Sequence, residues 1–161
     1  MKKWLLVVVV LTLASALVTG CASKSKMTPT PIDITGVVIT MERTACKDNC
    51  PVYLLTIYGN GSATYDGQMN VKRIGGAATS VSEEKINQLM SEFRKIDFFA
   101  LSDNYTAGSS IDFPTVIISI TIDGKEKSVT HYHGDTSAPK QLTTLENRID
   151  EILNINDQLI K

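Results

Sequence analysis

The sequence predicts an α+β fold in which an antiparallel β-sheet built from hairpins carries two helices packed on one face. Two observations lead to this class. The turn pairs Asn60-Gly61 and Asp123-Gly124 each separate two β-branched segments, which is a strong local signal for a hairpin. Two further segments carry apolar residues three and four positions apart, as helices do, and no strand–helix–strand alternation repeats. We therefore expect hairpins and not a parallel sheet.

Four strands are predicted in the first half of the chain. The β-branched run 36–41 predicts the first strand, and residues 52–58 predict the second. After the Asn-Gly turn, residues 63–66 return as a third strand. Residues 71–74 are expected to form a short fourth strand that ends at Gly75-Gly76.

A helix is predicted to begin after Ser82. The Ser82 side chain suits the N-cap position, and Glu83 and Glu84 suit the positive end of a helix dipole. The apolar residues that follow share one face, which we expect to pack on the sheet: Ile86, Leu89, Met90, Phe93 and Ile96. Residues 97–101 are expected to continue the core.

The second hairpin and the second helix complete the predicted fold. Residues 115–122 form the strongest strand pattern in the chain, and residues 125–133 return after the Asp-Gly turn. Pro139 suits the first turn of a helix. The apolar stripe of that helix consists of Leu142, Leu145, Ile149 and Ile152.

Composition limits the classes of function. The chain has 161 residues, 43% of them apolar, and a formal net charge of −1. That length allows one domain of ordinary size, and the composition is that of a globular protein. Phosphate binding needs a concentrated basic face, so nucleic acid is not an expected partner.

The first twenty residues have the parts of a secretory signal peptide. Lys2 and Lys3 precede an apolar run over residues 4–18, which is shorter than a transmembrane helix requires. The run ends in Leu-Val-Thr-Gly-Cys at residues 17–21, which resembles the lipobox of prokaryotic lipoproteins.

The lipobox resemblance implies three parts to the chain. Residues 1–20 would be the signal peptide, and Cys21 would carry the lipid at the start of a flexible linker that ends at residue 31. Residues 32–161 would form a single globular α+β domain. The protein would then be lipid-anchored in the cell membrane or the outer membrane, and its domain would face the periplasm or the exterior. Two or three acyl chains make such anchoring stable.

Cys46 and Cys50 lie four positions apart between two predicted strands. Outside the cytoplasm, such a pair is most simply a disulfide. The alternative is a metal site, because Cys-x-x-x-Cys-Pro resembles the loop of the copper chaperones that mature cytochrome oxidase. In that case Cys46 and Cys50 would bind copper together with His131 or His133. Those chaperones have a thioredoxin-like fold, whose strand–helix alternation is not predicted here.

A wider resemblance covers about residues 33–155. The residues that carry it are Arg43-x-x-Cys46-x-x-x-Cys50-Pro51-x-Tyr53, Gly61, Tyr65-x-Gly67, Phe98-Phe99 and Asp112-x-Pro114. This pattern resembles domain-of-unknown-function family 6438. The resemblance implies that the cysteine loop, the hairpin tyrosines and Asp112 belong to a shared framework, and it implies no activity.

Patterns typical of enzymes are missing from the sequence. No nucleophile elbow accompanies Ser109, Ser110, Asp112 and the two histidines, and no glycine-rich loop suits a phosphate. We therefore expect no catalytic residues and no cofactor. The first functional hypothesis is a non-catalytic interaction or structural module of the cell envelope, whose protein partner the sequence does not name. The alternative hypothesis is a copper-handling lipoprotein.

Overall fold

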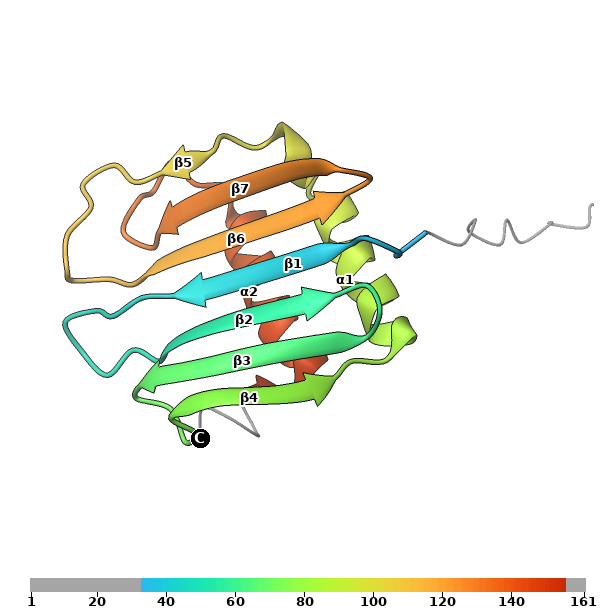
Figure 1. Ribbon diagram of the computed structural model, residues 1–161. Helices are drawn as coiled ribbons and strands as arrows, with labels where there is room; N and C mark the ends of the chain where they lie inside the picture. The colour runs from blue at the N-terminus through green and yellow to red at the C-terminus, as the bar shows by residue number, and fades with distance from the viewer. Residues whose placement is uncertain (1–32, 156–161) are drawn as a thin grey trace, which may run out of the picture. The chain divides into compact units, whose positions relative to one another are not determined.

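The computed structural model describes residues 33–155. The predicted signal peptide, Cys21 and the linker lie outside these residues. One seven-stranded sheet has the strand order β4-β3-β2-β1-β6-β7-β5. The helices α1 (Glu83–Lys95) and α2 (Lys140–Leu153) cover the same face of this sheet (Figure 1). The predicted α+β class is confirmed, and no helix in the described part is long and apolar enough to span a membrane.

The strands form a meander followed by a second hairpin. Neighbouring strands are antiparallel except for the short edge strand β5, which is parallel to β7. The strand bounds are β1 Val38–Arg43, β2 Val52–Tyr58, β3 Ser62–Met69, β4 Gly75–Ser80, β5 Asn104–Tyr105, β6 Thr115–Ile122 and β7 Lys125–Tyr132. A single 3₁₀ turn, η1 (Phe98–Ala100), follows α1.

The predicted fourth strand is in the wrong place. Strand β3 extends to Met69, so the turn occupies the region predicted as a strand, and Asn70 adopts a positive φ of 55° there. Strand β4 instead begins at Gly75, which was expected to end it. Its sequence GGAATS has little intrinsic β-propensity, so the strand is stabilised by its pairing with β3.

Three other strands also differ from the prediction, and of these β7 ends at Tyr132, one residue earlier than expected. Strand β1 begins and ends two residues later than expected, which places Arg43 opposite Tyr53 of β2. Strand β5 lies in a segment that has no strand pattern. By contrast, β2 and β6 have the predicted bounds. The turn at Asp123 and Gly124 has positive φ at both residues, as a hairpin turn that matches strand twist requires.

The core lies between the sheet and the two helices. Four of the five apolar residues predicted to face inward from α1 are buried in the core: Ile86, Leu89, Met90 and Phe93. Strand residues alternate between this layer and an open face, on which Leu54 and Tyr58 of β2 are exposed. The sheet is therefore apolar on the side of the helices and partly solvated on the other.

Candidate functional site

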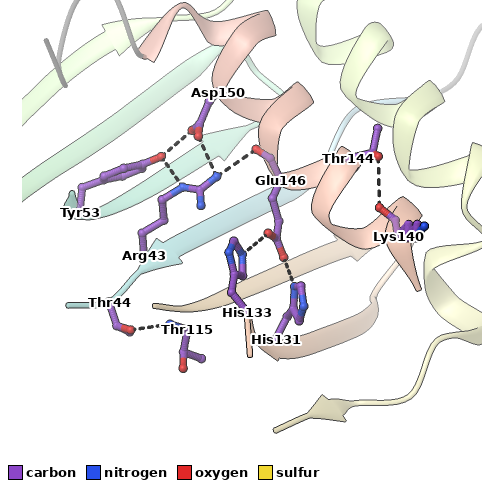
Figure 2. A network of polar contacts seen from close by, with 10 residues as sticks. All are labelled: Arg43, Thr44, Tyr53, Thr115, His131, His133, Lys140, Thr144, Glu146 and Asp150. Atoms are coloured by element: carbon purple, nitrogen blue, oxygen red, sulfur yellow. Dashed lines mark hydrogen bonds and ion pairs between the residues drawn. The ribbon is translucent and has the colours of Figure 1, made fainter. Parts of the chain in front are cut away.

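Six polar side chains lie together where α2 crosses the sheet (Figure 2). All come from strand ends or from the inner face of α2, and five of them are buried. We call this group the sheet–helix polar cluster: Arg43, Tyr53, His131, His133, Glu146 and Asp150. Buried polar groups need partners, and the members of this cluster supply them for one another.

Strand register brings the cluster together. Arg43 of β1 pairs with Tyr53 of β2 on one side and with Val116 of β6 on the other, and Val116 in turn pairs with His131 of β7. Residues paired in this way point to the same face of a sheet, here the helix side. On α2, Glu146 and Asp150 are four residues apart and therefore share one helical face.

Arg43, Tyr53 and Asp150 form one half of the cluster. The Arg43 guanidinium donates through Nε to the Tyr53 hydroxyl (2.9 Å) and through Nη2 to Asp150 Oδ2 (2.8 Å). The Tyr53 hydroxyl donates to Asp150 Oδ1 at 2.5 Å. Arg43 Nη2 also donates to the main-chain carbonyl of Glu146 at 3.3 Å. These bonds tie one turn of α2 to the centre of the sheet.

Burial shifts the pKa of two of these groups. It raises the pKa of the Tyr53 hydroxyl, so the phenol stays protonated and can donate to Asp150. Burial also raises the pKa of Asp150, while Arg43 and the Tyr53 hydroxyl act in the opposite direction. An ion pair with Arg43 thus offsets part of the cost of burying the Asp150 carboxylate.

His131, His133 and Glu146 form the other half. His131 Nδ1 lies 2.7 Å from Glu146 Oε1, and His133 Nε2 lies 2.7 Å from Glu146 Oε2. Glu146 is 0% exposed, whereas the His133 side chain is 24% exposed. Burial acts to raise the pKa of Glu146, but the hydrogen bonds from the two imidazoles outweigh it and hold the pKa below its usual value. One buried carboxylate thus contacts two imidazoles, of which that of His133 is partly exposed to solvent.

The second half of the cluster has the composition of a metal site. Its three ligand atoms, two imidazole nitrogens and one carboxylate oxygen, all lie within 4.8 Å of one another. Two nitrogens and an oxygen suit a divalent transition metal such as zinc. The structure therefore places both predicted histidine candidates in one group, with Glu146 as an unpredicted third member.

Cys46 and Cys50 are bonded to each other, which confirms the predicted disulfide. The loop that they close is joined to the segment before β6 by a main-chain hydrogen bond of 2.6 Å from Lys47 N–H to the Ile111 carbonyl. Within residues 33–155, the metal-ligand group around the histidines does not include either cysteine. The four residues predicted for copper binding are therefore divided between a disulfide and the polar cluster.

The remaining candidates have separate partners. Ser110 Oγ donates to Asp112 Oδ2 at 3.0 Å and shares a 2.9 Å hydrogen bond with the Tyr132 hydroxyl. The histidines instead bind Glu146. Asp112, which the family resemblance placed in a shared framework, lies in an exposed loop outside the polar cluster.

A cavity of about 300 Å³ lies elsewhere, beside β3, β4 and the end of α2. Tyr65 lines it, and the Tyr65 hydroxyl is the one buried side-chain polar atom in the described residues without a hydrogen-bond partner. Residues Leu153 and Ile155 also line this cavity, next to the end of the described chain.

Sequence reasoning missed Glu146 and Asp150. Both look like ordinary surface residues of a helix that reads as amphipathic. A usable signal existed, because Leu142, Glu146 and Asp150 succeed one another at intervals of four and therefore follow the edge of the buried stripe. Arg43 and Tyr53 were singled out only through the family resemblance, which assigned them no contact.

Comparison with known proteins gives one result. A family model described as Domain of unknown function (DUF6438) matches residues 37–153. This range contains the disulfide and all six members of the polar cluster. A search of curated proteins found no match.

Proposed function

The chain belongs to the DUF6438 family, and we propose that it is a lipid-anchored domain that works outside the cytoplasm as a non-catalytic interaction module of the cell envelope. The observation that carries the proposal is the Cys46–Cys50 disulfide. Disulfides persist in oxidising compartments and are rare in the cytosol. This agrees with a signal peptide over residues 1–20 and with Cys21 as the lipidated residue.

An exposed apolar pair supports an interaction role. Ile111 is 70% exposed and Phe113 is 53% exposed, both in the loop before β6. The hydrogen bond from Lys47 holds this loop against the disulfide loop, at one end of the sheet (Figure 1). Neighbouring exposed apolar side chains on a rigid support are typical of protein-binding surfaces. We therefore place the contact with an envelope protein at Ile111 and Phe113.

The anchor is tested by intact-mass analysis of the full-length product extracted from membranes. We expect a chain that begins at Cys21 and carries acyl groups. Because Trp4 is the single tryptophan, this product should show no tryptophan fluorescence. The Cys21→Ser variant should retain residues 1–20 and lack acyl groups, whereas the double variant Cys46→Ser/Cys50→Ser should be acylated normally. An unacylated wild-type chain that still begins with Met1 would overturn the proposal.

The interaction surface is tested by photo-crosslinking in the native membrane. A photoreactive residue at position 113 should give a discrete crosslink to one envelope protein. The matched control replaces Thr64, an exposed residue on the open face of β3, and should give none. Equal crosslinking from both positions would show that the Ile111–Phe113 surface is not a specific contact.

The copper alternative requires reduced cysteines, because thiolates are the soft ligands that copper(I) prefers. A thiol count on protein purified without reductant separates the two hypotheses. We expect no free thiol from Cys46 and Cys50. Two free thiols that take up copper(I) in a one-to-one ratio would favour copper handling over the module proposed above.

A further inference from the structure

We propose that His131, His133 and Glu146 bind one divalent transition metal ion, with zinc as the preferred ion. This site goes beyond the anchored module and is independent of the cysteine loop. It joins the end of β7 to α2, two elements that the chain connects only through a short turn region.

The geometry needs little adjustment to hold an ion. Glu146 Oε1 and Oε2 lie 2.7 Å from His131 Nδ1 and His133 Nε2, respectively. Zinc forms bonds of about 2.0–2.2 Å, so tetrahedral ligands lie about 3.4 Å apart. The His131 Nδ1–Glu146 Oε1 pair would open by less than about 1 Å. Because the three ligand atoms, one from each residue, lie within 4.8 Å of one another, no pair would have to close by more than about 1.5 Å. Since His133 follows the last residue of β7 and is partly exposed, its side chain has room for this shift.

The charge of the buried cluster favours a cation. Glu146 and Asp150 are two buried carboxyl groups, and Arg43 is the one guanidinium that contacts them among the described residues. Arg43 pairs directly with the Asp150 carboxylate, and it reaches Glu146 only at the main-chain carbonyl. The Glu146 carboxylate oxygens contact the two imidazoles instead. A buried charge is costly without a counter-charge, and a divalent ion between these ligands would supply it.

The ligand types select among metals. Two imidazoles and one carboxylate are a known three-ligand set for zinc, with a fourth position left for water. His133 supplies the solvent-facing side of the site, so the fourth position would lie there. Calcium and magnesium prefer oxygen ligands throughout, and copper(I) prefers sulfur, which is held in the disulfide here.

Arg43 acts as a positioning residue for this site. Its bonds to the Glu146 carbonyl and to Asp150 fix the turn of α2 that carries the Glu146 side chain. Groups of this kind, which hold a ligand without touching the metal, commonly change metal affinity 10- to 100-fold when removed.

The test is zinc titration of the metal-free full-length protein in detergent, without an affinity tag that contains histidine. His131 and His133 are the only two histidines in the chain, so any imidazole-dependent binding reports on this site. We expect one zinc ion per chain by calorimetry and native mass spectrometry. His133→Asn should weaken binding by more than about 10-fold. Glu151→Gln, which changes an exposed carboxylate on the same helix, should bind as the wild type does.

A second measurement covers variants that fold poorly. In the wild-type protein labelled with ¹⁵N at histidine, one ring nitrogen of each imidazole should shift on addition of zinc, and the melting temperature should rise with zinc concentration. Absence of zinc binding by the wild type, unchanged imidazole nitrogens, or undiminished binding by folded His133→Asn would each overturn the proposal. In those cases the two histidines serve only as hydrogen-bond donors to Glu146.

Discussion

Helices α1 and α2 pack on the same face of one sheet, but they are held there in different ways. Helix α1 begins at a side-chain cap, where Ser82 Oγ accepts from the Lys85 N–H at 3.4 Å, and it carries two acidic residues in its first turn. Its inner face is entirely apolar. Helix α2 begins after Pro139 with no side-chain cap and no acidic residue in its first turn, and its inner face buries Glu146 and Asp150.

The two helices thus differ in whether neighbouring or distant residues in the sequence determine their position. The start of α1 and its apolar stripe are encoded within about four turns of sequence. The polar contacts of α2 come from β1, β2 and the end of β7, and Arg43 is 107 residues from Asp150. Apolar surfaces can slide or rotate against one another at modest cost, whereas a buried ion pair has one satisfactory arrangement. We infer that the polar cluster fixes the position of α2 on the sheet.

The largest expected effect comes from Arg43→Met. This change leaves the buried Asp150 carboxylate without its guanidinium and should lower the free energy of unfolding by about 3–5 kcal/mol, as measured by urea denaturation. The matched control is Arg94→Met, an exposed arginine in the last turn of α1, which should change stability by less than about 0.5 kcal/mol.

The companion variant replaces the whole triad with apolar residues, as Arg43→Met/Tyr53→Phe/Asp150→Leu. Because neither member of the Arg43–Asp150 ion pair is then left buried without its partner, most of the lost stability should return. A triple variant as unstable as Arg43→Met alone would show that the loss came from packing and not from charge.

Leu89→Ala in α1 should have the next largest effect. Leu89 is fully buried, so the change should cost about 3 kcal/mol through lost apolar contact and the cavity that remains. Leu89→Met keeps the volume and should cost less than about 1.5 kcal/mol in the same denaturation experiment. Equal losses from the two variants would contradict the view that α1 depends on filled volume.

Glu146→Gln tests the opposite dependence in α2. The change keeps the volume but removes the charge that accepts hydrogen bonds from His131 and His133, so we expect a loss of about 2 kcal/mol in the presence of a chelator. Volume-conserving changes should therefore be tolerated in α1 and not in α2. A loss as small as that of Leu89→Met would remove this distinction.

The same division explains what could be predicted from the sequence. Strands β2 and β6 are β-branched and adjoin turn residues, so their bounds follow from local pattern. Strand β4 has no such pattern and forms because β3 extends far enough to pair with it. The disulfide was predictable because Cys46 and Cys50 are a pair close in sequence that follows a predicted signal peptide. The polar cluster was not, because each member finds its partner on another element.

The smallest expected effect concerns the two helix starts, whose capping residues have nearly the same backbone. Ser82 has φ −66° and ψ 151°, and Pro139 has φ −66° and ψ 136°. At the start of α1, Ser82→Ala should lower the free energy of unfolding by about 1 kcal/mol, because the Lys85 N–H loses its acceptor.

At the start of α2 the cap can be added instead of removed. Pro139→Ala and Pro139→Ser lose the same backbone restriction in the unfolded chain, so their difference isolates the contribution of the hydroxyl. Since residue 139 already has the backbone of an N-cap, Pro139→Ser should be more stable than Pro139→Ala by up to about 1 kcal/mol. If serine gives no advantage at 139 while Ser82→Ala is costly, then α2 is held so firmly by Arg43 and the histidines that its first turn has no influence on the stability of the fold.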